Sequence, residues 1–412
     1  MEETFPFYYT WKDFFFSSLG LITSLLDIGL DVWTIVSFYQ DGAHVYMGVM
    51  IFLLLFSSVL VQMFSWRWYS DSLDELHTHV EKYLNKHHLL KAFHVMQLGV
   101  YLRSVINSSS SRYVGLVEIS TRRFRHSDRF QEGVAVNLNH DLYMLRLIEA
   151  FSENAPQLTL MMSIIATRQE IQLLTGLKTL AAVAAIAWSV VTYHRSMREF
   201  LPDKRKMTWT GSVVYFFWNF LVIAPRVTAL ALFISVFPCY IIAHFLSVWM
   251  VLVLVVWSQK TDFMEDTRWE WLYRATVGLI WYFSWFNVGS RISKSKSIIY
   301  YTVLGLDTMA LLGFWWWKME HACILLIRPY IMISTLASLY VFGTILRIIY
   351  YKAFHPNCEM KKRDELNEHV MACGFSEETD SAEDVPPETP PPTQPVTRAQ
   401  KRMMTMGANF YS

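Results

Sequence analysis

Charged residues are scarce in this chain of 412 amino acids. Lys, Arg, Asp and Glu make up 17% of the sequence, whereas soluble proteins carry about a quarter. The 36 basic and 35 acidic residues nearly balance, and no basic region is typical of a nucleic-acid surface, so we expect no nucleic-acid partner. Hydrophobic residues make up 53% of the chain and gather in long uncharged stretches, which predicts an all-α polytopic membrane protein.

Cysteine and catalytic motifs are also lacking. Four cysteines without a CxxC pair exclude a disulfide-rich scaffold and give no spacing for structural zinc. The sequence contains no Walker-type glycine loop, no GxSxG and no HExxH motif. His77, His79, His87, His88 and His94 lie among lysines on an amphipathic segment, which favours a solvated helix face over a metal site. We therefore expect no enzyme activity, no cofactor and no metal.

Apolar segments of about 20 residues, the length that crosses a bilayer, occur eight times. The predicted spans are 14–38, 43–64, 139–167, 173–193, 211–238, 241–257, 298–317 and 322–349. A ninth apolar patch between Arg274 and Arg291 is too short to cross, so we expect a re-entrant or interfacial segment at about 270–290.

The basic residues indicate the orientation. If the N-terminus is inside, the inner loops hold 21 Lys and Arg, and the outer loops hold only Arg168 and Lys318. Because Lys and Arg are retained on the cytoplasmic side, both termini are predicted to be cytoplasmic.

The spans divide the chain into two predicted halves, 1–193 and 194–350, with four spans each. In the first half, loop 65–138 repeats apolar residues at helical spacing, which predicts cytoplasmic helices, either amphipathic on the membrane face or packed on the span ends. A cytoplasmic helix is expected over 351–375. The region 376–412 begins with acidic, Ser, Thr and Pro residues and is predicted to be a disordered regulatory tail.

Charged residues inside the spans are the candidate functional residues. Asp27 and Asp31 are four residues apart and share a helix face, and Glu149 and Glu153 repeat this spacing. Pro156 follows shortly and should distort its helix, because proline lacks an N–H group.

The second half places Arg226 in the fifth span and Asp307 in the seventh. Gln62 in the second span and His244 in the sixth are uncharged polar groups. In one interpretation, Arg226 pairs with one or two carboxylates and the charges only hold the helices in register. In the other, the excess of carboxylates faces a hydrophilic path, since ions at mid-bilayer cost roughly 3 kcal/mol each. Such a path suits a lipid headgroup, a cation or an amino acid, and the residues do not separate these.

Several motifs resemble the XK-related (Xkr) family of phospholipid scramblases, in order and with matching span spacing from residue 12 to about 360. They are Asp27-Ile-Gly-Leu-Asp31-Val-Trp33, Gln62-Met-Phe-Ser-Trp66-Arg-Trp68, Glu153-Asn-Ala-Pro156-Gln157-Leu158, Pro225-Arg226-Val-Thr-Ala-Leu and Phe354-His355-Pro356.

The resemblance implies eight spans in two pseudo-symmetric halves, with short re-entrant helices. It also implies scrambling that exposes phosphatidylserine at the plasma membrane without ATP or calcium. The matching positions for a lipid path or charged core are Asp27, Asp31, Glu149, Glu153, Arg226 and Asp307. Trp33 is a candidate gate, although Trp at span ends is often an interface anchor. A single-span immunoglobulin-type chaperone such as basigin or neuroplastin is a candidate partner.

One branch of the family is activated when an executioner caspase removes the tail during apoptosis. Here Glu377-Glu378-Thr379-Asp380 precedes Ser381, so cleavage is expected after Asp380, although Glu replaces the preferred Asp four residues before the cut. Asp384 is a poorer candidate because Val385 follows it. An acidic linker without a protease role is the alternative.

The resemblance leaves two other functions open: a secondary transporter for a small cation or amino acid, and a membrane scaffold that transports nothing.

Cys239 and Cys323 both fall at predicted outer ends of spans, where they could form a disulfide or remain two buried thiols.

Overall fold

The computed structural model describes residues 27–71, 140–168, 173–199, 207–259, 261, 263–264, 266–286, 294–319 and 329–354. The first described helix covers 27–40, and another covers 140–149 and continues into η3. The remaining elements are α2 (His44–Asp71), η3 (Ala150–Asn154), α7 (Ala155–Arg168), α8 (Leu173–Glu199), α9 (Trp209–Val236), α10 (Tyr240–Ser258), α11 (Thr267–Trp281), α12 (Lys294–Met319), α13 (Pro329–Ile349) and η4 (Tyr350–Phe354). The regular structure in these ranges is helical, which confirms the predicted all-α class.

Six of the described helices are long and apolar enough to cross a membrane. They are His44–Trp68, Gly176–Arg198, Trp209–Val236, Tyr240–Ser258, Lys296–Met319 and Pro329–Phe354. Each coincides with a predicted span, so the polytopic architecture is confirmed. The first predicted span is described only from residue 27, and the third is interrupted by η3. The count of eight and the pseudo-symmetric halves therefore stay predictions.

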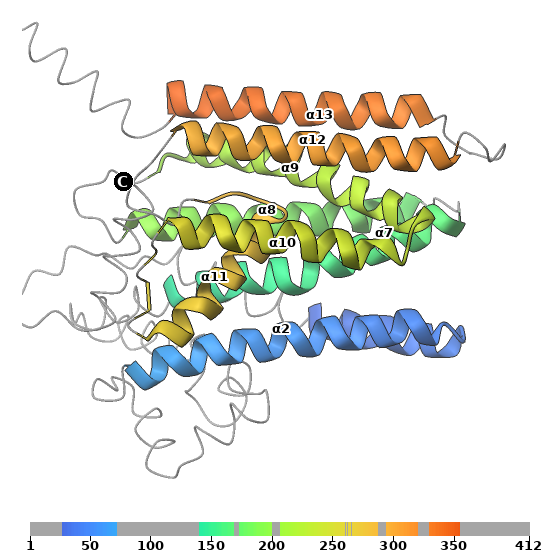
Figure 1. Ribbon diagram of the computed structural model, residues 1–412, viewed down its shortest axis with the longest axis horizontal. Coiled ribbons are helices and arrows are strands. Elements are labelled where there is room, and N and C mark those ends of the chain that lie inside the picture. Colours follow the sequence, from blue (N-terminus) through green and yellow to red (C-terminus); the bar gives the residue numbers. More distant parts are fainter. Residues whose placement is uncertain are drawn as a thin grey trace, which may run out of the picture.

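The central helix of the bundle is α9, which packs against α7, α8, α12 and α13. Figure 1 shows α12 and α13 on one side of α9, with α7 and α8 on the other and α2 farthest from α13. The N-cap residue Thr208 starts α9 by accepting a hydrogen bond from the Gly211 N–H at 3.1 Å. In α13, Gly343 lets the two helices approach closely, because a Cβ atom there would lie 3.2 Å from the Leu221 carbonyl carbon.

The segment expected to be re-entrant contains α11. With 15 residues this helix is about 22 Å long, shorter than the roughly 30 Å hydrocarbon core. Its N-cap Asp266 accepts from the Arg268 N–H at 3.0 Å. In its first turn the buried Glu270 accepts hydrogen bonds from the backbone N–H groups of Phe263 and Met264, at 3.0 and 2.7 Å. These hydrogen bonds hold the segment between α10 and α11 against the first turn of α11.

Several predictions concern residues outside the described ranges. They are most of loop 65–138 with its histidines, residues 355–375 of the helix predicted over 351–375, the tail at 376–412 with Asp380, and Cys323. Cys239 is exposed at the N-terminus of α10. The disulfide therefore stays a prediction.

Candidate functional site

Two helices bring four carboxyl groups together, and each helix contributes a pair spaced four residues apart. Asp27 and Asp31 come from helix 27–40, whereas Glu149 and Glu153 come from the end of helix 140–149 and from η3. Asp31 and Glu153 are 8% and 5% exposed. Their side chains are in hydrogen-bonding contact, and Glu149 acts electrostatically on both Asp27 and Glu153. We call these four residues the acidic cluster.

Uncharged polar side chains surround the acidic cluster. Gln157 donates from Nε2 to Oδ2 of Asp31 at 3.1 Å, and this hydrogen bond joins α7 to helix 27–40. The Asn154 side chain is hydrogen-bonded to Asp27. From α2, Ser57 contacts Ser152 with 2.7 Å between the hydroxyl oxygens. Three separate helical segments therefore meet at this cluster through polar contacts.

A basic residue that the sequence reasoning missed lies close to the cluster. Arg146 acts electrostatically on Asp27. It precedes Glu149 by three residues and Glu153 by seven, so all three share a helix face, and this spacing was the available signal. The predicted charge balance included Arg226 alone, whereas Arg146 adds an arginine beside the acidic cluster. Among the described residues, the four carboxyl groups of the cluster still outnumber this one arginine.

Pro156 explains the shape of the backbone at the cluster. Because proline has no N–H group, the usual hydrogen bond to residue 152 cannot form. The preceding turn widens into the π-helix η3, and the N–H of Ala155 bonds to the carbonyl of Ala150, five residues back. The predicted helix distortion is thus present. Single π-turns often occur at functional sites, and this one carries Glu153.

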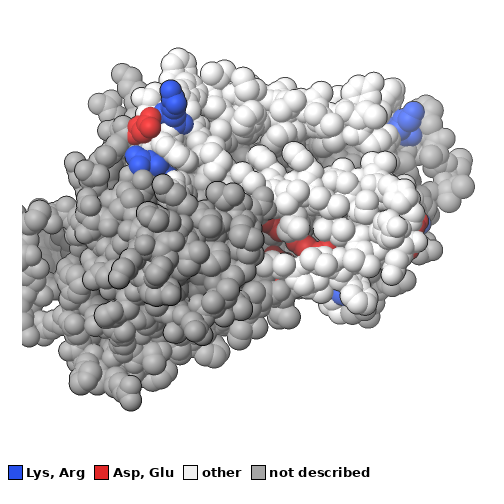
Figure 2. Space-filling model, turned by 90° about the horizontal axis from the view of Figure 1, so that it is seen from below, with Lys and Arg blue, Asp and Glu red and all other residues white. Residues whose placement is uncertain are grey.

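The described surface on the α2 side is mostly uncharged. Figure 2, seen from this side, shows acidic atoms in a recess of a mainly white surface, with a few separate patches of basic and acidic atoms elsewhere. Trp33, the candidate gate on helix 27–40, is 75% exposed. Its side chain is therefore directed toward the surroundings of the protein, and a gating role stays a prediction.

A second group of charges lies around Arg226, whose side chain is fully buried. Its Nη1 is 2.5 Å from Oδ2 of Asp307 in α12, and its Nε donates to the Tyr282 carbonyl at 3.2 Å. His244 of α10 contacts Oδ1 of Asp307 at 3.1 Å and the Tyr282 hydroxyl at 2.9 Å. The guanidinium also lies 4.8 Å from the centre of the Tyr282 ring. Arg226 therefore pairs with Asp307, as expected if the charges hold the helices in register. His244 contacts both Asp307 and Tyr282 beside this pair.

The six charged residues expected to act together thus form two groups. Asp307 is paired within the Arg226 group, where Nη1 and Nε of the buried arginine have partners and Nη2 has none among the described residues. Among those same residues, the acidic cluster keeps an excess of carboxyl groups. Among the described residues, no group of three or more His, Cys, Asp or Glu has an arrangement that could hold a metal ion.

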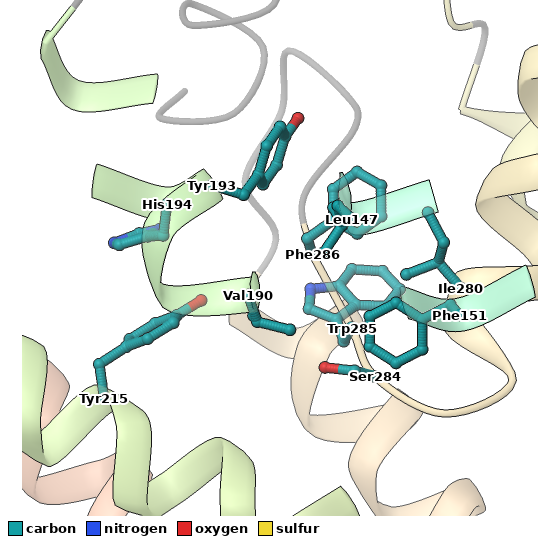
Figure 3. Close-up of a pocket in the computed structure, with 10 residues that line it drawn as sticks. All are labelled: Leu147, Phe151, Val190, Tyr193, His194, Tyr215, Ile280, Ser284, Trp285 and Phe286. Atoms are coloured by element: carbon teal, nitrogen blue, oxygen red, sulfur yellow. The ribbon is translucent and has the colours of Figure 1, made fainter. Parts of the chain in front are cut away.

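The packing is nearly complete where the segment after α11 meets helix 140–149, η3, α8 and α9. Figure 3 shows a cavity lined by Leu147, Phe151, Val190, Tyr193, His194, Tyr215, Ile280, Ser284, Trp285 and Phe286. Its volume is about 10 Å³, which is close to the space that one water needs. A lipid headgroup does not fit there, so this region serves as packing in the described state.

Comparison with known proteins defines the class of this bundle. The family model for the XK-related protein matches residues 15–356. The chain therefore belongs to the XK-related family, as its motifs indicated.

Individual relatives carry one shared name. XK-related protein 8 of Tetraodon nigroviridis is 43% identical over 364 residues, covering 86% of each chain. The proteins of that name from Gasterosteus aculeatus and Pan troglodytes are 40% and 34% identical over 360 and 349 residues. Both alignments cover 84% of this chain and 85% of the relative.

Proposed function

We propose that this protein is a phospholipid scramblase of the plasma membrane that exposes phosphatidylserine during apoptosis. Membership of the XK-related family supports this class of function. The observation that carries the proposal is the acidic cluster, which gathers four carboxyl groups between helices of a membrane bundle with Arg146 as the nearby basic group.

The cluster suits a path for headgroups for an electrostatic reason. Asp31 and Glu153 are largely buried and touch each other. Like charges in contact need a shared proton, water or a positive group between them, and each ion costs roughly 3 kcal/mol at mid-bilayer. A zwitterionic headgroup supplies a cationic amine to the carboxylates, while its acyl chains stay beside the mostly uncharged surface around the recess.

The proposal includes a switch in the C-terminal tail. An executioner caspase cuts after Asp380 and releases residues 381–412, which opens the cytoplasmic mouth of the path. Both termini are cytoplasmic in this scheme. A single-span immunoglobulin-type chaperone such as basigin or neuroplastin brings the protein to the plasma membrane.

The test is fluorescent-lipid scrambling in proteoliposomes that contain the purified full chain, measured before and after executioner-caspase treatment. Asp380→Ala removes the proposed cut, and Asp384→Ala is a matched control in the same tail. We expect activity only after cleavage, loss of activation in Asp380→Ala, and normal activation in Asp384→Ala. Activity before cleavage would keep the scramblase and reject the switch.

Two other functions would give different results. A secondary transporter for a small cation or amino acid would show saturable solute uptake without loss of lipid asymmetry. A scaffold would show neither activity. In a scaffold, Asp31→Asn or Glu153→Gln would lower folding yield only, whereas the proposal expects reduced scrambling by protein that folds normally.

A further inference from the structure

A partly buried arginine outside both charge groups, Arg347, lies near the end of α13. Arg347 donates from Nη2 to the Ser297 hydroxyl in the first turn of α12. Its guanidinium carbon lies 4.2 Å from the centre of the Tyr301 ring and 5.8 Å from the ring centres of Trp218 and Tyr351. We call these five residues the Arg347 cluster. It joins α9, α12, α13 and η4 at one end of the bundle.

The cluster contains two hydrogen-bond donors that have no acceptor among the described residues. Nε of Arg347 and Nε1 of Trp218 are buried atoms without an acceptor among the described residues. Trp218 is 3% exposed. Within the same part of the chain, no carboxylate pairs with Arg347. Buried donor atoms normally have partners, and a guanidinium that is partly removed from water is stabilised by a counter-charge. The missing partner is therefore an acceptor, and an anion satisfies both needs.

The surroundings of the cluster place it at a membrane boundary. Ile298 and Ile299 of α12 are 59% and 62% exposed, and Ile348 of α13 is 54% exposed. Lys296 and Lys352 are exposed beyond these apolar residues, at the start of α12 and in η4. The positive-inside pattern predicts that this end faces the cytoplasm. Apolar side chains thus adjoin basic ones at the depth where phospholipids carry their phosphates.

From this geometry we propose that the Arg347 cluster binds the phosphate of an anionic phospholipid in the cytoplasmic leaflet. The phosphate accepts hydrogen bonds from Arg347 and Trp218, and Lys296 adds positive charge at its exposed side. The acyl chains lie along the exposed isoleucines of α12 and α13. Basic pockets between helices at the cytoplasmic side commonly bind anionic headgroups. The inference is independent of scrambling, because it concerns a bound lipid that holds α9, α12 and α13 together.

The test measures thermal unfolding of the purified full chain in detergent, titrated with phosphatidic acid, phosphatidylcholine or inorganic phosphate. Phosphatidic acid should raise the Tm saturably, whereas phosphatidylcholine and inorganic phosphate should not at the same concentrations. Arg347→Gln should raise the phosphatidic acid concentration at half-saturation about tenfold, since it removes a charge-assisted hydrogen bond.

Two further variants keep the test decisive if Arg347→Gln does not fold. Lys296→Gln removes an exposed charge and Trp218→Phe removes one N–H but keeps a ring, and each should raise the half-saturation concentration about threefold. Lys318→Gln, at the other end of α12, is the matched control and should behave as wild type.

Three results would overturn the inference. Equal stabilisation by phosphatidylcholine would show that the site does not select an anion. Equal stabilisation by inorganic phosphate would show that the ligand is not a lipid. An unchanged half-saturation concentration in Lys296→Gln and Trp218→Phe would show that phosphatidic acid binds elsewhere.

Discussion

The pair of Arg226 and Asp307 allows a strict test of what the buried charges contribute to stability. Asp307→Leu removes the carboxylate that lies 2.5 Å from Nη1 of Arg226. The guanidinium would keep its hydrogen bonds to the Tyr282 carbonyl and the Thr308 hydroxyl, at 3.2 and 3.3 Å. It would nevertheless be a fully buried cation without its counter-charge. We therefore expect a large loss of stability.

The magnitude follows from burial. Removing one partner of a buried ion pair costs about 3 to 5 kcal/mol. Arg226 is fully buried, but the Asp307 side chain is 26% exposed, so water offsets part of the cost. We expect a destabilisation of about 3 kcal/mol, near the lower end of the range. Replacing both partners by apolar side chains, in Arg226→Met with Asp307→Leu, should restore most of the stability, because no unpaired charge remains.

The assay is reversible unfolding of the purified protein in mixed micelles, with the two single variants and the double variant forming a cycle. Asp41→Asn, at the exposed turn between helix 27–40 and α2, is the matched control and should be neutral. A double variant as unstable as the summed single variants would refute the reasoning, since the two side chains would then be energetically independent. Scrambling by the double variant would separately show whether this pair also takes part in transport.

Two further predictions concern packing and the α10–α11 connection. Gly343→Val should destabilise the bundle by about 1 to 3 kcal/mol, since its Cβ would meet the Leu221 backbone at 3.2 Å. Gly313→Ala is the control and should be neutral in the same unfolding assay, because nothing lies within 4 Å of a Cβ atom at that position. Glu270→Gln should cost about 2 kcal/mol. The amide oxygen can still accept from the N–H groups of Phe263 and Met264, but the amide NH2 replaces the oxygen that accepts from the Thr261 hydroxyl and lies 3.4 Å from Nε of Arg274. Limited proteolysis of the α10–α11 connection should then be faster, and unchanged cleavage would contradict that role.

Local features of the candidate site could be predicted because they depend on residues close in sequence. The spacing of Asp27 with Asp31 and of Glu149 with Glu153 placed each pair on one helix face, and the structure brings the two pairs together. The missing N–H of Pro156 predicted the distortion that appears as η3. Arg146 could have been found by the same spacing rule.

Span positions also followed from the sequence, since a helix that crosses hydrocarbon must be apolar over about 20 residues wherever it packs. The same requirement prevents the sequence from revealing the tertiary contacts. Lipid-facing and protein-facing sides of a span are both apolar, so hydrophobic periodicity does not show which helices meet.

Only the tertiary structure decided that Arg226 pairs with Asp307, 81 residues away, and not with the acidic cluster. It also placed α9 at the centre of the bundle and enclosed Arg347 among aromatic rings from α9, α12 and η4. These outcomes depend on which helix faces fit against one another, and that fit is set by close packing and by the pairing of buried charges across the bundle.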